Sequence, residues 1–301
     1  MQRYIMPLVF LIGLSILIMR LVLDSRFGTT TLFYLLIPFA TSVLLYFFTK
    51  PLEGRSVGTA FVNHLRSSGI VFLLTSAFLM EGFLCVLFFM PIYFFMVIIG
   101  FLFAYLFRDK SSHKSVSLLV IVLALSIEGV LPQTSFPRYN EATFVTQTHQ
   151  DVDQLKENMA DDIHMPKQKD WFLRIFPLPD SVKAGSLAEG DIHNLHFTYK
   201  KWGFTNFSTG EMDILISKVG ERHIQTQIIK NTAYFSHYTN IKGTEVFFTP
   251  LEEGGTQVSL TVKYERLLDP YWYFAPLQHL AAKQSARYLV DNIIVRGETY
   301  G

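Results

Sequence analysis

The run GTQVSLTVKYERLLDPYWYFAPLQHLAAKQSARYLVDNIIV, residues 255–295, decides the fold of the C-terminal half. From Val258 to Tyr264 apolar side chains alternate with polar ones, which is the period of a half-buried strand. Asp269 and Pro270 should then start a helix, as N-cap and first helical residue. A strand that leads into an amphipathic helix predicts a sheet whose apolar face the helix covers. The expected inner face of the helix comprises Leu277, Leu280, Ala281, Gln284, Tyr288 and Ile293.

Composition divides the chain of 301 residues into two parts. Half of the residues are hydrophobic and the mean hydropathy is +0.28, but the excess lies almost wholly before about Gln133. We therefore predict a membrane all-α bundle over residues 1–132 and a soluble α+β domain over residues 133–301. The net charge of +1 gives no basic field that would indicate nucleic acid. The lone Cys85 lacks the companions of a zinc site, so we expect no metal and no cofactor.

Apolar runs in the first part predict about five membrane spans, because about 20 apolar residues cross a bilayer. Pro91 favours a hairpin near residues 88–93, which divides one long run into two spans. Residues 50–68 are polar and predict a loop, with or without a short interfacial helix, in which His64 is solvated. The predicted spans cover residues 4–23, 31–48, 69–107 as a pair, and 115–130.

Basic residues predict the orientation of these spans. With five spans, Arg3 and the basic loops over residues 50–66 and 108–114 lie on one side, which should be cytoplasmic. The N-terminus is then cytoplasmic and the C-terminal domain lies outside, in a plasma or inner membrane. Four spans would place the basic loops on opposite sides, and that alternative stays open.

Two carboxylates, Glu81 and Glu128, lie within the apolar runs. Acids inside a membrane are costly and often functional, so each is a candidate proton or cation site. Alternatively, a protonated Glu81 is hydrogen-bonded inside the bundle, and Glu128 is solvated at the end of its span.

The second part reads as a strand over residues 140–148, a helix over 150–159 and a short apolar segment over 171–176. A meander of strands follows, over residues 191–200, 207–219, 223–229 and 244–250, with turn signals between them. This order, together with WFLRIFPLP at 171–179, SLAEGDIHNLHF at 186–197 and the opening stretch, resembles the SRPBCC superfamily. That group includes START-like, birch-pollen-allergen-like and polyketide cyclase/dehydrase-like proteins.

The resemblance covers about residues 139–294 and implies a helix-grip fold, in which a curved sheet holds the terminal helix around a mostly apolar cavity. The superfamily hosts lipid carriers, receptors, cyclases and hydrolases, so the fold does not decide the function. Residues expected to line the cavity are Tyr199, Tyr234, His237, Tyr238, Trp272, Leu277, Leu280, Gln284 and Tyr288. The alternative is that these side chains fill the core.

Three functions follow as hypotheses. The first is a membrane-anchored protein that binds a hydrophobic, lipid- or polyketide-like molecule, with the bilayer as its other partner. The second is a cyclase- or hydrolase-type enzyme that acts on such a molecule, with His237 and tyrosines as acid/base groups. The third is a transport or signalling protein with Glu81 at its working site and the soluble domain as sensor. His193 and His196 should point to opposite faces of a strand, which argues against a metal site.

Overall fold

The computed structural model describes residues 30–49, 54, 56–78, 83–108, 112–130, 132–160, 165, 172–176, 179–183, 186–202 and 205–296. The chain forms two compact units. The first comprises Met1–Phe136 together with Leu268–Tyr273, and the second comprises Pro137–Leu267 together with Phe274–Gly301.

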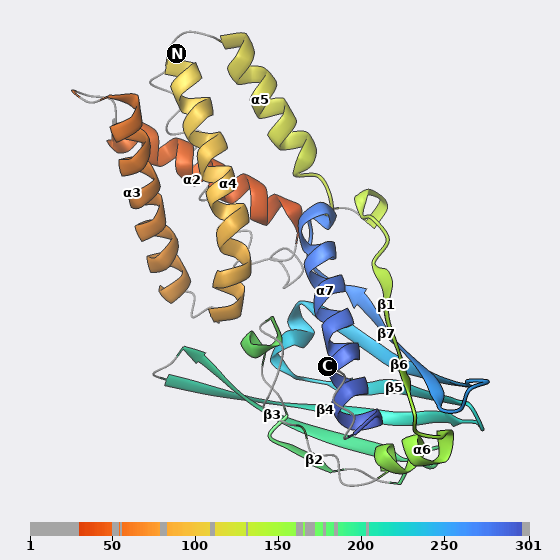
Figure 1. Cartoon of the computed structure of the whole chain (residues 1–301). Coiled ribbons are helices and arrows are strands. Elements are labelled where there is room, and N and C mark those ends of the chain that lie inside the picture. Colours follow the sequence, from red (N-terminus) through yellow and green to blue (C-terminus); the bar gives the residue numbers. More distant parts are fainter. Residues whose placement is uncertain are drawn as a thin grey trace. The chain divides into compact units, whose positions relative to one another are not determined.

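Four helices form the described part of the first unit: α2 (Thr31–Thr49), α3 (Val57–Phe78), α4 (Phe83–Arg108) and α5 (Ser112–Leu125) (Figure 1). Three apolar stretches are long enough to cross a membrane, namely Thr31–Thr49, Val57–Leu74 and Val86–Arg108. The apolar part of α5, Val116–Leu125, is shorter. The predicted span over residues 4–23 lies outside the described residues, so the structure does not show five spans.

Two sequence predictions for this unit are wrong. Helix α4 continues through Pro91, so there is no hairpin at residues 88–93. A proline is tolerated inside a membrane helix because neighbouring groups can satisfy the freed backbone. Helix α3 begins at Val57, so most of the polar segment over residues 50–68 is helical rather than a loop.

One polar side chain of α3, that of His64, fits into the bundle because it finds a partner on another helix. His64, expected to be solvated, is only 1% exposed. The hydroxyl of Ser42 in α2 donates to the carbonyl of Val97 in α4 at 2.8 Å, and its oxygen lies 2.9 Å from Nε2 of His64. Since the hydroxyl has one proton, already donated, the imidazole must donate through Nε2. Ser42 therefore joins three helices.

The segment Leu268–Tyr273 packs within this first unit. Glu128 Oε1 accepts the backbone N–H of Tyr271, the first residue of α7 (Tyr271–Leu289), at 2.8 Å. The hydroxyl of Tyr273 donates to the carbonyl of Phe88 at 2.7 Å, three residues before Pro91. A carboxylate at a helix N-terminus satisfies an amide that has no intrahelical partner and opposes the helix dipole. Glu128 thus caps α7, a role that the sequence had suggested for Asp269.

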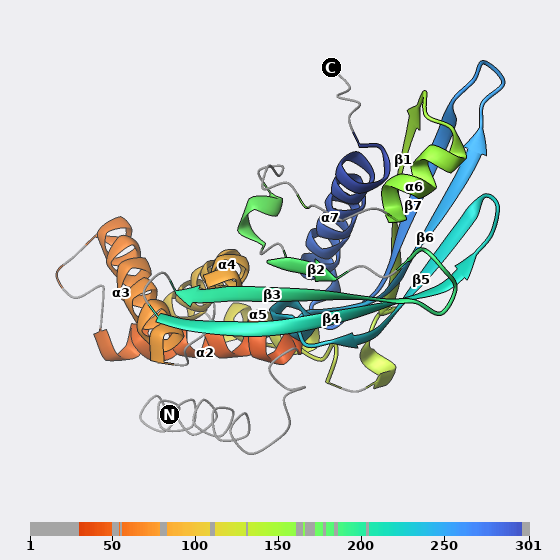
Figure 2. The ribbon, with the colours of Figure 1, turned by 90° about the horizontal axis from the view of Figure 1, so that it is seen from below.

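The second unit is a seven-stranded antiparallel sheet in the order β1-β7-β6-β5-β4-β3-β2 (Figures 1 and 2). Its strands are β1 (Tyr139–Thr148), β2 (Ser181–Lys183), β3 (Ile192–Trp202), β4 (Thr205–Val219), β5 (His223–Asn231), β6 (Thr239–Pro250) and β7 (Thr256–Arg266). The short elements are α6 (Val152–Ala160), η3 (Leu173–Ile175) and η4 (Tyr234–His237). All predicted strands are confirmed, and among the described strands only the three-residue β2 was missed. A sheet of this kind with a C-terminal helix fits a helix-grip fold.

Helix α7 covers one face of the sheet, as the opening stretch predicted. Along β7 every second residue is buried, from Thr256 to Arg266. Val258, Leu260 and Val262 pack with Ala286, Val290 and Ile294, so the C-terminal half of α7 and the π-helical turn Val290–Ile294 seal this end of the sheet. The buried residues of α7 itself are Phe274, Gln278, Ala286 and Tyr288, so the predicted inner face is wrong at Leu280, which is exposed.

Helix α6 and Gln150, which precedes it, hold the chain that follows α7. Asn158 Nδ2 donates to the carbonyl of Ile294 at 2.8 Å, and Gln150 Nε2 donates to that of Arg296 at 3.1 Å. These bonds satisfy carbonyls that lack partners beyond a helix C-terminus.

Substitution of Gly100 by alanine should destabilise the helical unit. The added Cβ would lie 2.7 Å from Cβ of Ser42 and 2.9 Å from the carbonyl of Phe39, so α2 and α4 would have to separate. We expect a loss of about 1–3 kcal/mol, as overpacking usually costs, measured by thermal unfolding in detergent. Gly58→Ala in α3 is the matched control, because nothing lies within 4 Å of its new Cβ. Equal melting temperatures for the two variants would contradict the close contact.

Loss of the Glu128 carboxylate should loosen the start of α7. Glu128→Ala removes the acceptor of the Tyr271 amide, and loss of such a cap costs about 0.5–2 kcal/mol. Amide hydrogen exchange over residues 271–274 should therefore speed up roughly two- to thirtyfold. Glu128→Gln keeps an acceptor oxygen and should retain most of the protection. Unchanged exchange in Glu128→Ala would show that the cap does not hold the helix.

Candidate functional site

Three tyrosines from β3 and the η4 region meet on the second unit, and we call them the tyrosine cluster: Tyr199, Tyr234 and Tyr238. The rings of Tyr199 and Tyr234 stack with centroids 4.2 Å apart and planes at 13°. The hydroxyl of Tyr238 donates to that of Tyr234 at 3.2 Å. Tyr199 is buried, whereas Tyr234 and Tyr238 are half-buried. The cluster is thus an aromatic surface with a polar edge.

Local sequence explains why η4 lies against the sheet. A side chain at Gly210 in β4 would bring a Cβ within 2.6 Å of the carbonyl of Thr232 and Cα of Ala233. Only glycine allows so close an approach between β4 and the chain that enters η4. Asn231 Oδ1 then accepts the N–H of Ala233 at 3.1 Å and stabilises the turn.

Gln278 of α7 contacts the tyrosine cluster through the backbone of Tyr238. Its Nε2 donates to the carbonyl of Tyr238 at 2.9 Å, and the residue is only 8% exposed. Its Oε1 is buried and has no hydrogen-bond partner among the described residues. Sequence reasoning missed Gln278, although it lies four residues after Phe274 and four before Ala282, at the spacing of one helix face.

The residues of α7 that were predicted to line the cavity do not gather beside the tyrosine cluster. Trp272 belongs to the first unit, is 49% exposed, and has its ring 6.5 Å from that of Phe95. Leu277 is half-buried and Leu280 is exposed. Gln284 is half-buried, with an Oε1 that, like that of Gln278, has no partner among the described residues. Tyr288 is buried, and burial raises the pKa of its phenol.

His237 and Glu128 are not enclosed in the way that a catalytic or transport site requires. His237 is exposed, with its ring centroid 6.5 Å from that of Tyr234. A general base is tuned by enclosure and neighbours, and an exposed imidazole lacks enclosure. Glu128 is the cap of α7, and Glu81 lies outside the described residues. In the described part of the chain, no three His, Cys, Asp or Glu side chains form a group that could hold a metal.

Two apolar clusters lie on the sheet. One packs against α7, and we call it the closed end; the other includes no residue of α7 among the described residues, and we call it the open end. At the closed end, buried residues of β5, β6 and β7 pack against the helix. At the other end, a cluster centred on Leu195, Phe197 and Met212 is flanked by side chains that are only partly buried: Met165, Val182, Ile214, Ile228, Phe235 and Ile241. The rings of Phe197 and Phe235 lie 5.7 Å apart, which joins this open end to η4. Partly covered apolar side chains beside the tyrosine cluster make this end the candidate site.

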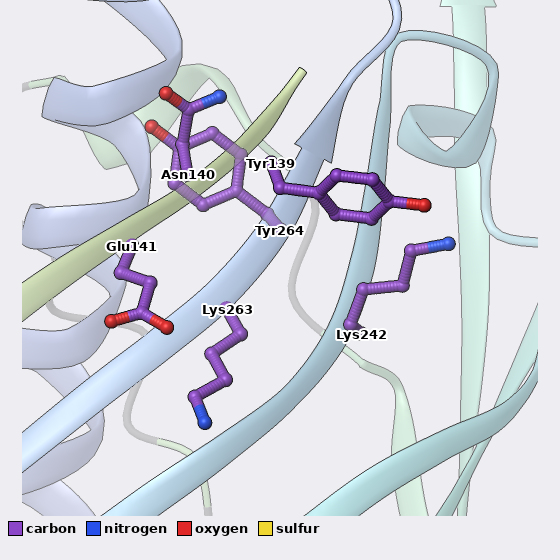
Figure 3. A pocket seen from close by; sticks show the side chains of 6 residues that line it. All are labelled: Tyr139, Asn140, Glu141, Lys242, Lys263 and Tyr264. Atoms are coloured by element: carbon purple, nitrogen blue, oxygen red, sulfur yellow. The ribbon is translucent and has the colours of Figure 1, made fainter. Parts of the chain in front are cut away.

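A pocket of about 410 Å³ lies at the start of β1 and the end of β7, and is lined by Tyr139, Asn140, Glu141, Lys242, Lys263 and Tyr264 (Figure 3). Lys242 pairs with Glu265 at 2.8 Å, and Lys263 pairs with Glu245 at 2.7 Å. Its cations are therefore matched by neighbouring carboxylates. A second pocket of about 240 Å³ lies along α6, at Gln150, Gln154, Glu157 and Asn158. Neither of these two pockets is the predicted apolar cavity beneath α7.

No protein-family model matches this chain, and no curated protein matches it. Its similar solved structures include the crystal structure of Ara h 8.0201, with 10% identity over 51% of this chain and 99% of the other, and a TM-score of 0.33. The AHSA1-like protein from Aeromonas hydrophila is 13% identical over 54% of this chain and 100% of the other, with a TM-score of 0.32. Norcoclaurine synthase from Thalictrum flavum was solved with dopamine and hydroxybenzaldehyde. It is 11% identical over 54% of this chain and 90% of the other, with a TM-score of 0.33. These neighbours are of the birch-pollen-allergen-like, SRPBCC type and match the C-terminal half.

Proposed function

We propose that this chain is an integral membrane protein whose C-terminal SRPBCC-like domain binds a hydrophobic, lipid- or polyketide-like molecule. The observation that carries the proposal is the open end of the sheet, where six apolar side chains around Leu195, Phe197 and Met212 are only partly buried. Apolar surface left in contact with water is unfavourable by about 25 cal/mol for each Å². A hydrophobic molecule beside the tyrosine cluster would cover it.

The apolar surface of the helical unit supports the membrane part of the proposal. Large side chains are exposed along α3 and α4: Val62, Ile70, Leu73, Leu74, Leu87, Met90, Phe95, Ile98 and Leu102. Contiguous apolar surface on this scale marks contact with a membrane or a protein partner. The length and hydropathy of α2, α3 and α4 favour the membrane.

The orientation is also part of the proposal. If each described helix crosses the bilayer, the basic connections α2–α3 and α4–α5 lie at the same end of the bundle. The positive-inside rule places that end in the cytoplasm and the C-terminal domain outside, in a plasma or inner membrane. A cytoplasmic N-terminus further requires residues 4–23 to form a fifth span.

Photolabelling of the full chain in phosphatidylcholine nanodiscs tests ligand binding. The probe is an uncharged apolar aryl diazirine, which labels lipid-facing helices and any apolar site. We expect labelled peptides both in α2–α4 and around β4, β5 and η4. Ile214→Trp should fill the open end and reduce labelling there roughly tenfold, as a loss of about 1.4 kcal/mol in binding would.

Ile229→Trp is the control, because Ile229 is an exposed isoleucine of β5 and not one of the six side chains that border the open end. Its labelling pattern should match that of the unmodified protein. Labels confined to residues 31–125, with none in the sheet, would overturn the ligand-binding proposal.

A further inference from the structure

We propose that Gln278 makes this site selective for hydrophobic alcohols, that is, for long-chain or polycyclic molecules that present a hydroxyl donor. The inference rests on the proposed function and names the ligand class of the same site. It depends on the direction in which the Gln278 amide is held and on the lack of a hydrogen-bond donor to its oxygen among the described residues.

The backbone holds the amide in one direction. The carbonyl of Tyr238 accepts from Gln278 Nε2 at 2.9 Å and from the N–H of Leu267 at 3.3 Å. A carbonyl can only accept, so the NH₂ group must face it, and the reversed amide would place two oxygens against each other. Oε1 therefore points away from Tyr238.

That oxygen is an unmatched acceptor inside the protein. Oε1 is buried without a partner among the described residues, on a side chain that is more than nine-tenths buried. Buried acceptors without donors are unfavourable, and native structures rarely keep them without a reason. A ligand hydroxyl would supply the missing donor, whereas an ether or ester oxygen could not.

The neighbours of Gln278 favour a flat or extended apolar body behind that hydroxyl. Tyr238 connects Gln278 to the stacked rings of Tyr234 and Tyr199 through its own hydroxyl. Rings of this kind bury large apolar area and offer faces for stacking. The nearby buried cation is Arg266, at the end of β7, which has interactions of its own. A carboxylate ligand would need that cation, and an alcohol does not.

Three photoreactive ligands with the same chain and diazirine separate these chemistries: 1-hexadecanol, its methyl ether and hexadecanoic acid. The full chain in phosphatidylcholine nanodiscs is labelled with each, and peptides from η4 and α7 are quantified. Labelling of α4 peptides normalises for the amount of each ligand in the bilayer. We expect the alcohol to label the site roughly fivefold more than the ether, the usual effect of one net hydrogen bond.

Gln278→Met keeps the length of the side chain but removes its acceptor, so the alcohol should lose its advantage over the ether. Gln284→Met removes the other unmatched amide oxygen of α7 and should leave the preference unchanged. If Gln278→Met does not fold, the comparison of alcohol with ether in the unmodified protein still decides the question. Equal labelling by alcohol and ether, or preference for the acid, would overturn this inference but keep the proposed function. No labelling of the site by any ligand would overturn both.

Discussion

The fold of the second unit depends on the need to cover the apolar face of its sheet. Strand β7 pairs with β1 on one side and β6 on the other, and every second side chain along it is buried. Helix α7 follows β7 almost directly and packs its C-terminal half on this part of the sheet. Residues of α7 belong to the cluster around Val258 and Leu260, and none of them belongs to the described cluster around Leu195 and Met212. The candidate site is a consequence of this uneven cover.

Polar side chains that are buried or partly buried in the two units follow the same physical rule. Ser42, Glu128 and Gln278 each bind a backbone group far away in the sequence, on Val97, Tyr271 and Tyr238 respectively. A buried polar atom is expensive unless it is hydrogen-bonded, and such long-range bonds therefore hold elements together. Gln278 differs because only its nitrogen is satisfied in the described structure. An amide with both atoms bonded has a purely structural role, whereas the unbonded oxygen of Gln278 is available to a ligand.

Periodicity in the sequence was sufficient for most of the second unit. Alternation of apolar and polar residues predicted β1 and β3–β7, and helical spacing predicted α6 and α7, because each element has one buried face. Periodicity is uninformative in the first unit, because apolar side chains there occupy both buried and exposed positions. There Pro91 predicted a turn that α4 does not make, and the polar residues near His64 predicted a loop where α3 forms.

The sequence by itself determined the division into an apolar and a more polar half, the order of strands and helices, and the closeness of Tyr234 to Tyr238. Only the tertiary structure decided which side chains meet. It stacks Tyr199 on Tyr234 and leaves His237 and Leu280 exposed. It buries Gln278, which was not among the predicted site residues. Local spacing assigns a residue to a face within its own element, but partners across the sheet depend on strand register and on the rotation of α7. Those are set by packing and hydrogen bonds between distant segments, which no local pattern contains.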